Sequence, residues 1–407
     1  MENKKQTLMI LCTVPDERAE MVLYECSKRD IRSVFVAEVF HEETANAADC
    51  FYTADWNDSD ALLRIARNEK ITGITGLCDK AMVPAAKVSV TMGLPGNTPE
   101  CIEMFLSKNS FRLLQENAGA FCPKHFVTGS AEGIRERISE FRFPLIVKPL
   151  LCSSSFGMTT LYDTEGLEEA FAKASKASRN GQVCVEEFIE NDSLRIVETD
   201  VFVVEDDILW DGIRFCYRLP EAPLRPVYDV YPADLADDEL REIKTSVKAV
   251  LRTAGVRLGE FNVEGFFTPE GRFFIVEINP RQAGHYNPQD IELYCGVSLT
   301  RLLITTSCGD LSYYEELGNF HRERNNIFSY SVFAFREGIL KDIYIDPGIK
   351  SCLKVMRFLH GQKPGDHVCD ILHAVRPICK TVFEFETAGE LEKARKQIRD
   401  LVYPVLK

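Results

Sequence analysis

The 407-residue chain contains no G-x-G-x-x-G sequence, no G-K-[ST] triplet and no C-x-x-C pair. These absences exclude the common dinucleotide-binding loop and the Walker A phosphate loop. They also remove the usual signature of a cysteine-based zinc or redox site. Any nucleotide or metal chemistry must therefore come from less conspicuous residues.

Positive charge and long apolar runs are also scarce. The chain has 48 Lys and Arg against 62 Asp and Glu, a formal net charge of −14. This balance disfavours a nucleic-acid partner, because such binding depends on clustered basic residues. No run approaches the roughly 20 apolar residues of a membrane span, and the short apolar run from Leu8 to Leu11 has no cleavage-like signal after it. We expect a cytoplasmic monomer or homodimer that binds neither nucleic acid nor membrane.

The 14 cysteines are spread singly along the chain. Several of them, such as Cys12, Cys152 and Cys184, lie in apolar runs, where a free thiol behaves as a small hydrophobic group. Their spacing predicts neither a zinc site nor a disulfide framework.

Strands and helices alternate in the first quarter of the chain. Apolar runs predict strands at 6–12, 33–39 and 71–77, and helical periodicity occurs at 17–29, 58–68 and 79–92. This alternation predicts a parallel, doubly wound α/β unit. After a linker, a helix is predicted from Pro99 to about Asn117. Lys108 and Arg112 share one face of that helix, and composition favours a solvated basic edge over a phosphate site there.

The stretch from Gly259 to Gly284 carries the strongest chemical signal. Two runs rich in aromatic and β-branched residues flank a turn that contains Pro269 and Gly271, which predicts a β-hairpin. With Pro269 and Glu270 as the turn residues, Glu264 faces Ile275 across the ribbon.

In that register Glu264, Ile275, Glu277 and Asn279 lie on one face, because side chains alternate along a strand. Glu264 and Glu277 are then diagonal neighbours, about 7–8 Å apart at the backbone. Two carboxylates and an amide oxygen are ligands that suit magnesium held against phosphates. A solvated hairpin with two incidental glutamates is the alternative, and a one-residue slip of the register would favour it.

Two earlier stretches suggest a phosphate site. The apolar strand that ends in Lys148 is followed by a loop rich in small residues, Cys152-Ser-Ser-Ser-Phe-Gly157. Backbone N–H groups and hydroxyls in such a loop can contact phosphate oxygens, and a nearby lysine adds charge. The strand Gln182 to Ile189 can present backbone groups to an adenine base, although its side chains alone are those of an ordinary core strand. A plain hairpin loop remains the alternative reading of the serines.

The remaining chain mixes strands and helices. Two antiparallel strands are predicted in 194–217, helices at 234–254, 289–303 and 388–401, and short strands in 326–354 and 368–385. Length alone favours two to three domains.

These motifs, in this order, resemble the ATP-grasp superfamily, and within it most closely the carboxylate–amine ligases, including L-amino-acid ligases. The resemblance rests on Lys108 at a helix, on the strand ending in Lys148 with its Ser/Gly loop, on Val185-Glu-Glu-Phe-Ile189, and on Glu264 followed by Glu277-Ile-Asn-Pro-Arg281. Residues 329–407 are also similar to the closing subdomain of the biotin carboxylase type.

The resemblance implies an α/β and α+β protein with an ATP-grasp fold. Its parts would be an N-terminal Rossmann-like domain at 1–97, an ATP-grasp domain of two α+β lobes at 98–310, and a small C-terminal closing subdomain at 311–407. Such enzymes transfer the γ-phosphoryl group of ATP to a carboxylate, and an amine then attacks the acyl phosphate.

The resemblance also implies a role for each candidate residue. Lys148 would contact ATP phosphates and act in catalysis, and Arg281 would steady the transferred phosphoryl group. The remaining ATP contacts would come from Lys108, Ser153, Ser154, Ser155, Gly157, Glu186, Glu187, Phe188 and Ile189. Magnesium, or manganese, would be held by Glu264, Glu277 and Asn279. His285 would line the substrate pocket with Arg281, although an exposed loop histidine is an equal alternative.

The sequence departs from the family pattern in two places. Glu190-Asn-Asp-Ser follows Ile189 where the family often has a glycine and a ribose-binding acid. Asp192, Glu198 and Asp200 are all candidates for the ribose contact, and Asp200 is slightly favoured. The phosphate loop also has three serines where many relatives have glycines.

Three kinds of activity remain open at this point. The leading hypothesis is a ligase that joins a small carboxylic acid, such as an amino acid, to an amine or to the thiol of a carrier protein. The others are a bicarbonate-activating carboxylase and an ATP-binding scaffold without turnover. The set formed by Glu264, Glu277, Asn279 and Arg281 argues against the scaffold, because loss of a metal ligand is the simplest route to inactivity.

Overall fold

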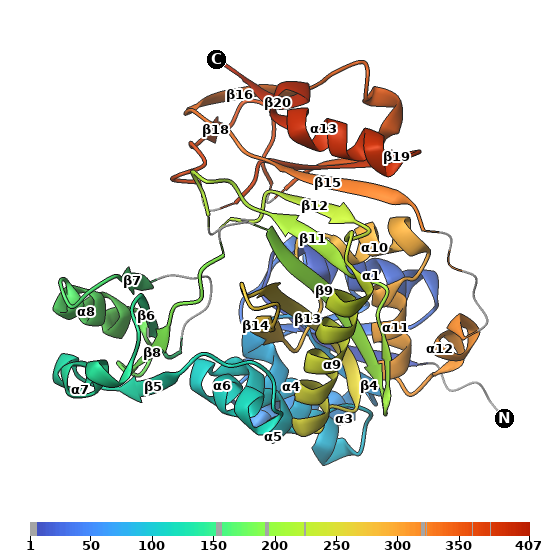
Figure 1. Ribbon diagram of the computed structural model, residues 1–407. Helices are drawn as coiled ribbons and strands as arrows, with labels where there is room; N and C mark the ends of the chain where they lie inside the picture. Colours follow the sequence, from blue (N-terminus) through green and yellow to red (C-terminus); the bar gives the residue numbers. More distant parts are fainter. Residues whose placement is uncertain are drawn as a thin grey trace.

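A computed structural model describes residues 6–151, 157–191, 195–223, 225–318, 322, 324–359, 361–374 and 376–407. In Figure 1 a small lobe at the left and a C-terminal part at the top extend from a larger body that contains the N-terminal sheet. Within the described residues, no helix is both long enough and apolar enough to cross a bilayer. Helices and several sheets make up a mixed α/β architecture.

The N-terminal part is a parallel sheet with helices on both faces. Its strand order is β3-β2-β1-β4 and all pairs are parallel, as predicted. The elements are β1 (Thr7–Leu11), α1 (Glu17–Lys28), β2 (Arg32–Ala37), α2 (Glu42–Ala47), β3 (Cys50–Thr53), α3 (Ser59–Asn68), β4 (Gly73–Gly76) and α4 (Asp79–Met92). The sequence reading missed α2 and β3, which are too short to show a clear period.

The predicted helix over 99–117 is two helices, α5 (Pro99–Leu106) and α6 (Lys108–Asn117). Ser107 between them has φ −109° and ψ 132°, and its side chain accepts a hydrogen bond from the Ser110 backbone N–H. A serine in extended conformation that caps the next helix ends the preceding one. Lys108 therefore occupies the first turn of a new helix rather than the middle of a long one.

The small lobe is an antiparallel sheet of order β5-β8-β6-β7. Helices α7 and α8 pack against its apolar residues. The elements are β5 (His125–Thr128), α7 (Ala131–Arg137), η1 (Ile138–Glu140), β6 (Leu145–Pro149), β7 (Thr159–Leu161), α8 (Leu167–Ala177) and β8 (Val183–Glu187). The central strands β6 and β8 carry Lys148 and Glu186 to the same part of the lobe.

A large antiparallel sheet runs from the body into the C-terminal part. Its order is β14-β13-β9-β11-β12-β15-β19-β17, with β10 paired to β9. The elements are β9 (Arg195–Val204), β10 (Asp207–Leu209), β11 (Arg214–Tyr217), β12 (Tyr228–Tyr231), α9 (Asp237–Thr253), β13 (Leu258–Phe267), β14 (Phe273–Asn279), β15 (Asn326–Val332), β17 (Leu353–Phe358) and β19 (Cys379–Phe385). Because β12 pairs with β15, hydrogen bonds cross the predicted boundary at 310.

The remaining elements are α10 to α12 and the rest of the C-terminal part, which contains a second sheet of order β18-β16-β20. They are α10 (Asn287–Cys295), α11 (Leu299–Ser307), α12 (Ser312–Leu317), β16 (Gly338–Ile345), η2 (Lys350–Cys352), β18 (His367–Val368), α13 (Ala388–Leu401) and β20 (Val402–Leu406). The predicted helix over 289–303 is interrupted at Gly296, whose φ is 75°. Side chains of α10 and α11 share one apolar core with β1, β2 and α1, so the N-terminal sheet is packed against the body.

The hairpin of β13 and β14 differs from the predicted register. Gly265 pairs with Ile275, and Phe267 pairs with Phe273, so the strands are offset by one residue from the expected pairing. A β-bulge between Glu264 and Gly265 then places Glu264 directly opposite Glu277. The prediction that Ile275 shares the face of Glu277 is wrong, because Ile275 and Ile278, three residues apart, both enter the same apolar core. The bulge breaks the alternation between them and so compensates for the offset.

Replacing Gly265 by alanine should disturb this arrangement. A Cβ at this position would lie 2.6 Å from the Phe274 carbonyl oxygen and 2.5 Å from the Phe273 ring, so the backbone must shift. We expect a loss of about 1–3 kcal/mol in the free energy of unfolding, measured by urea denaturation. Gly129→Ala is the control, since nothing lies within 4 Å of its added Cβ. Equal stability of the two variants would contradict the bulge assignment.

Candidate functional site

The two hairpin acids lie together with an amide. Glu264 and Glu277 face each other across β13 and β14, and the Asn279 side-chain amide donates to Glu277 Oε1 over 3.0 Å. Burial raises the pKa of the Glu264 carboxyl to about 7, and an ion pair with Arg218 opposes that rise. The nearby carboxylates of Glu277 and Glu198 add to it. Such closely held acids favour a bound cation, so these residues fit the magnesium site that the sequence predicts.

A buried charge network lies beside the hairpin. Lys148 Nζ is 2.5 Å from Glu186 Oε2, and Arg112 Nε is 3.3 Å from Glu186 Oε1. Glu186 is only 1% exposed and Arg112 only 3%. Although burial alone would raise it, the charges of Arg112 and Lys148 hold the pKa of Glu186 down at about 2. Lys148 is thus fixed by a carboxylate, and the Glu186 side chain is engaged inside the lobe.

Arg112 is a residue whose importance the sequence reading missed. Its guanidinium donates to the carbonyl oxygens of Ile275 and Val276, at 3.2 Å each, and to Gln115 Oε1 at 2.6 Å. The interpretation of Lys108 and Arg112 as a solvated basic edge is wrong for Arg112, which ties α6 to strand β14. Its spacing from Lys108 was the available signal, but spacing does not reveal burial.

The segment from Glu187 to Ile189, at the end of β8, leads to an apolar cluster. Glu187 Oε1 accepts from the Arg142 backbone N–H over 3.0 Å, and the Phe188 N–H donates to the Pro144 carbonyl over 2.8 Å. Ile189 packs against a cluster formed by Ile196, Cys216, Phe266 and Phe274, together with Phe121 and Val276. Because Val276 precedes Glu277, this cluster lies next to the acidic hairpin.

The predicted phosphate loop is described only at its end. Ser153, Ser154 and Ser155 lie outside the described residues. Gly157 has φ 80°, and a Cβ there would lie 2.5 Å from the Ala177 Cβ. The glycine at the end of the loop is therefore required both by its backbone conformation and by the close approach of α8.

Arg281 and His285 lie where three parts of the chain meet. Arg281 Nε is 2.6 Å from Asp79 Oδ1, at the first residue of α4. The His285 backbone N–H donates to Glu17 Oε1 over 2.9 Å, and its carbonyl accepts from Lys380. The segment after β14 therefore joins the N-terminal sheet, the hairpin and the C-terminal part.

Asp200 has a different environment from the one expected for a ribose contact. It is fully buried, with Arg214 Nη1 2.6 Å from Oδ2 and the Asn262 amide 3.0 Å from Oδ1. Both carboxylate oxygens already have partners inside the sheet, so we leave Asp200 out of the nucleotide site. Asp192, another candidate, lies outside the described residues, and Glu198 pairs with the same Arg214.

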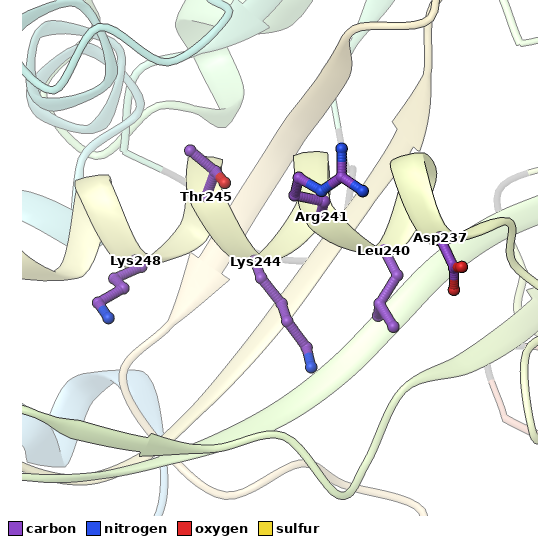
Figure 2. Close-up of a pocket in the computed structure, with 6 residues that line it drawn as sticks. All are labelled: Asp237, Leu240, Arg241, Lys244, Thr245 and Lys248. Carbon is purple, nitrogen blue, oxygen red and sulfur yellow. The ribbon is translucent and has the colours of Figure 1, made fainter.

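The described surface has two hollows near the body of the protein. A hollow of about 310 Å³ lies along α9 and is lined by Asp237, Leu240, Arg241, Lys244, Thr245 and Lys248 (Figure 2). None of the predicted site residues lines it. A smaller hollow of about 60 Å³, between β4, α4 and β13, includes Arg281 in its lining. The larger hollow therefore has no part in the site.

The low pKa of Glu186 predicts an acid-sensitive contribution to stability. A carboxyl with a depressed folded-state pKa stabilises the protein above its unfolded pKa, near 4.5, and this stabilisation is lost as the pH falls towards 2. The ionised Glu186 carboxyl contributes about 3 kcal/mol to the free energy of unfolding. We expect Glu186→Gln to be less stable at neutral pH, and its urea titrations to lack the loss of stability that the wild type shows between pH 4.5 and 2. Glu187→Gln is the control, and an unchanged acid profile in Glu186→Gln would contradict the network.

The chain is similar in sequence to proteins of a known family. Residues 113–282 match the family described as D-ala D-ala ligase C-terminus. An uncharacterised protein, y4rH, from Sinorhizobium fredii is 27% identical over 331 residues, which cover 79% of this chain and 64% of that protein. The chain thus spans just under two thirds of that relative's length.

Solved structures share the fold over nearly the whole chain. An L-amino acid ligase from Bacillus licheniformis superposes with a TM-score of 0.83 at 16% identity and covers 99% of both chains. Biotin carboxylase from Campylobacter jejuni gives a TM-score of 0.73 at 15% identity, covering 98% of this chain and 92% of that one. The family match over 113–282 and the fold shared along nearly the whole chain support the ATP-grasp fold that the sequence predicts.

Proposed function

We propose that this protein is an ATP-dependent ligase that activates a small carboxylate, such as an amino acid, as an acyl phosphate and transfers it to an amine, with release of ADP and phosphate. The observation that carries the proposal is the placement of Glu264 opposite Glu277, beside Asn279, in a hairpin bound by Arg112. Arg112 also contacts Glu186, the partner of Lys148. The proposed metal ligands of the hairpin are thereby linked to Lys148, the proposed phosphate-binding lysine, through the side chains of Arg112 and Glu186.

In this proposal ATP lies between the small lobe and the hairpin. Lys108 and Lys148 contact its phosphates, and the loop that contains Ser153 to Ser155 and ends at Gly157 covers them. The backbone from Glu186 to Ile189 contacts the adenine, whose faces pack on the apolar cluster around Phe266 and Phe274. A largely apolar pocket with few polar contacts is typical of such a base site.

Magnesium, or manganese, would be held by Glu264, Glu277 and Asn279. When bound, it neutralises charge on the phosphates during transfer. The chain's own residues position the reactants: Lys148, fixed by Glu186, supplies a localised positive charge, and the planar Arg281 guanidinium binds the substrate carboxylate and the transferring oxygens. Asp79 holds the Arg281 guanidinium in place through the 2.6 Å ion pair, and His285 would line the substrate pocket beside it.

A bicarbonate-activating carboxylase is the second candidate. The likeness of fold to biotin carboxylase supports it, since bicarbonate would use the same metal ligands and the same Arg281. A third possibility, an acceptor that is a carrier-protein thiol, has no supporting feature among the described residues.

The test uses the purified protein with magnesium, ATP and a panel of amino acids. Hydroxylamine traps an acyl phosphate as a hydroxamate, and ADP, AMP and phosphate are measured together. Hydroxamate with ADP and phosphate, dependent on one acid, is the expected result. AMP with pyrophosphate would contradict the acyl phosphate, and ATP hydrolysis that depends on bicarbonate alone would favour the carboxylase. Binding of ATP without turnover on any acid would indicate a scaffold.

A further inference from the structure

Three side chains of metal-binding type meet where α6 is followed by β5. They are Glu116 near the end of α6, Cys122 in the connecting segment and His125 at the start of β5. His125 Nδ1 lies 3.9 Å from Cys122 Sγ and 3.6 Å from Glu116 Oε1. The three ligand atoms all lie within 4.8 Å of one another. One imidazole nitrogen therefore faces both a thiol and a carboxylate.

Among the described residues, a second group, formed by Glu198, Cys216 and Asp229, has comparable spacing. That group already contains a cation, because the Arg214 guanidinium lies 2.5 Å from Glu198 and 3.6 Å from Asp229. Its cysteine is also fully buried. In the group around His125 the cysteine is only partly buried and the Glu116 side chain is 51% exposed, so an ion can reach it from solvent.

We propose that Glu116, Cys122 and His125 form a binding site for Zn²⁺ or a similar thiophilic divalent ion. Zinc combines thiolate, imidazole and carboxylate ligands at about 2.0–2.3 Å. In tetrahedral geometry these bond lengths correspond to ligand separations of about 3.3–3.8 Å, within a few tenths of an ångström of the 3.6 and 3.9 Å observed. The thiol proton leaves to solvent on binding, and water completes the coordination on the exposed side of Glu116.

Alternative partners of the three groups are weak. Cys122 Sγ donates over 3.5 Å to the carbonyls of Arg112 and Pro123, and His125 Nδ1 is 3.3 Å from the Pro123 carbonyl. The thiol is a weak donor and the 3.3 Å contact of Nδ1 is long for a hydrogen bond, so a metal ion would replace these contacts at little cost. The sequence had argued against a zinc site on the absence of C-x-x-C, but the spacing here is Cys-x-x-His with a distant glutamate.

The site lies next to the charge network formed by Arg112, Lys148 and Glu186 in the small lobe. His125 pairs with Glu186 across β5 and β8, and residues directly opposite in antiparallel strands share a face. Glu116 belongs to α6, the helix that carries Lys108 and Arg112. An ion bound to Glu116 and His125 would therefore link α6 to the sheet of the small lobe.

Cobalt absorbance tests the site without reference to activity. The full-length protein is freed of metals with a chelator and titrated with Co²⁺, which gives a sulfur-to-cobalt charge-transfer band when a thiolate binds. We expect one equivalent per chain, displaced by Zn²⁺. Cys122→Ser should remove the band, and Glu116→Gln, on an exposed side chain, should weaken binding at least about tenfold. Cys369→Ser, at an exposed cysteine in the C-terminal part, is the matched control.

The outcomes separate the proposal from its alternatives. No charge-transfer band in the wild type, or a band that persists in Cys122→Ser, would overturn it. If Glu116→Gln binds Co²⁺ with the affinity of the wild type, Glu116 is not a ligand and the proposed site is wrong. A second measurement follows thermal unfolding: Zn²⁺ should raise the midpoint of the wild type and of Cys369→Ser, but not that of Cys122→Ser, because only a protein with the intact site gains stability from the ion.

Discussion

Glu277→Gln is expected to lower kcat by about 1000-fold or more while the fold is retained. Glu277 lies directly opposite Glu264 and accepts a hydrogen bond from Asn279. Glutamine keeps the size of the side chain but removes one negative charge from the proposed magnesium ligands. Phosphoryl transfer depends on neutralising charge that spreads over the phosphate oxygens, and loss of one well-placed electrostatic contact alone costs about 100–1000-fold.

The control for this variant lies in the same hairpin. Glu270→Gln makes the same chemical change at an exposed turn residue, and we expect near-normal kcat there. Kinetics would be measured over a range of magnesium concentrations, with circular dichroism to verify the fold. If Glu277→Gln keeps near-normal kcat at moderate magnesium, the metal assignment is wrong.

Arg281→Lys is expected to reduce kcat about 100-fold or more. Lysine keeps the positive charge but has no planar fork, so it cannot hold a carboxylate and a phosphoryl oxygen in fixed geometry. Because the proposed contact strengthens during transfer, the loss should appear in kcat more than in the KM for ATP. Steady-state kinetics with ATP and the identified acid measure both constants.

The partner of Arg281 distinguishes catalysis from a structural ion pair. Asp79→Asn removes the carboxylate 2.6 Å from Arg281 Nε but leaves the guanidinium in place. We expect a smaller effect than in Arg281→Lys, and mainly on the KM for the carboxylate. Arg272→Lys, at an exposed arginine of the hairpin, should be neutral. Equal losses in Asp79→Asn and Arg281→Lys would mean that the ion pair, rather than substrate contact, explains the arginine.

The sequence predicted the hairpin but not how its strands pair. Turn residues and strand composition are local properties, so the two strands and their acids could be read directly. The register was predicted one residue away from the observed one, and the bulge beside Gly265 that brings Glu264 opposite Glu277 was not predicted, although a glycine inside a strand is consistent with one. Close contact of Gly265 with Phe273 and Phe274 decides it, and those contacts form only when the ribbon packs on the core.

Some helix boundaries were likewise predictable from local sequence, whereas others depend on tertiary packing. The period of apolar residues located α4 and α13 correctly, because their ends coincide with strong local signals. It did not separate α5 from α6, since Ser107 and its neighbours allow either a continuous helix or a cap. Tertiary packing selects the cap, which makes Lys108 the first residue of α6 and leaves Arg112 one turn further along the same helix.

By itself the sequence determined the class of protein: alternating strands and helices at the start, an acid-rich hairpin, and lysines and a serine loop in the order of the ATP-grasp family. These features depend on composition and order along the chain. Only the tertiary structure decided which charges are buried and paired. Arg112 with Glu186, Asp200 with Arg214, and His125 with Cys122 and Glu116 are each brought together by the packing of separate elements. Burial and pairing of charge depend on how these elements pack against one another, and no local pattern of residues encodes that packing.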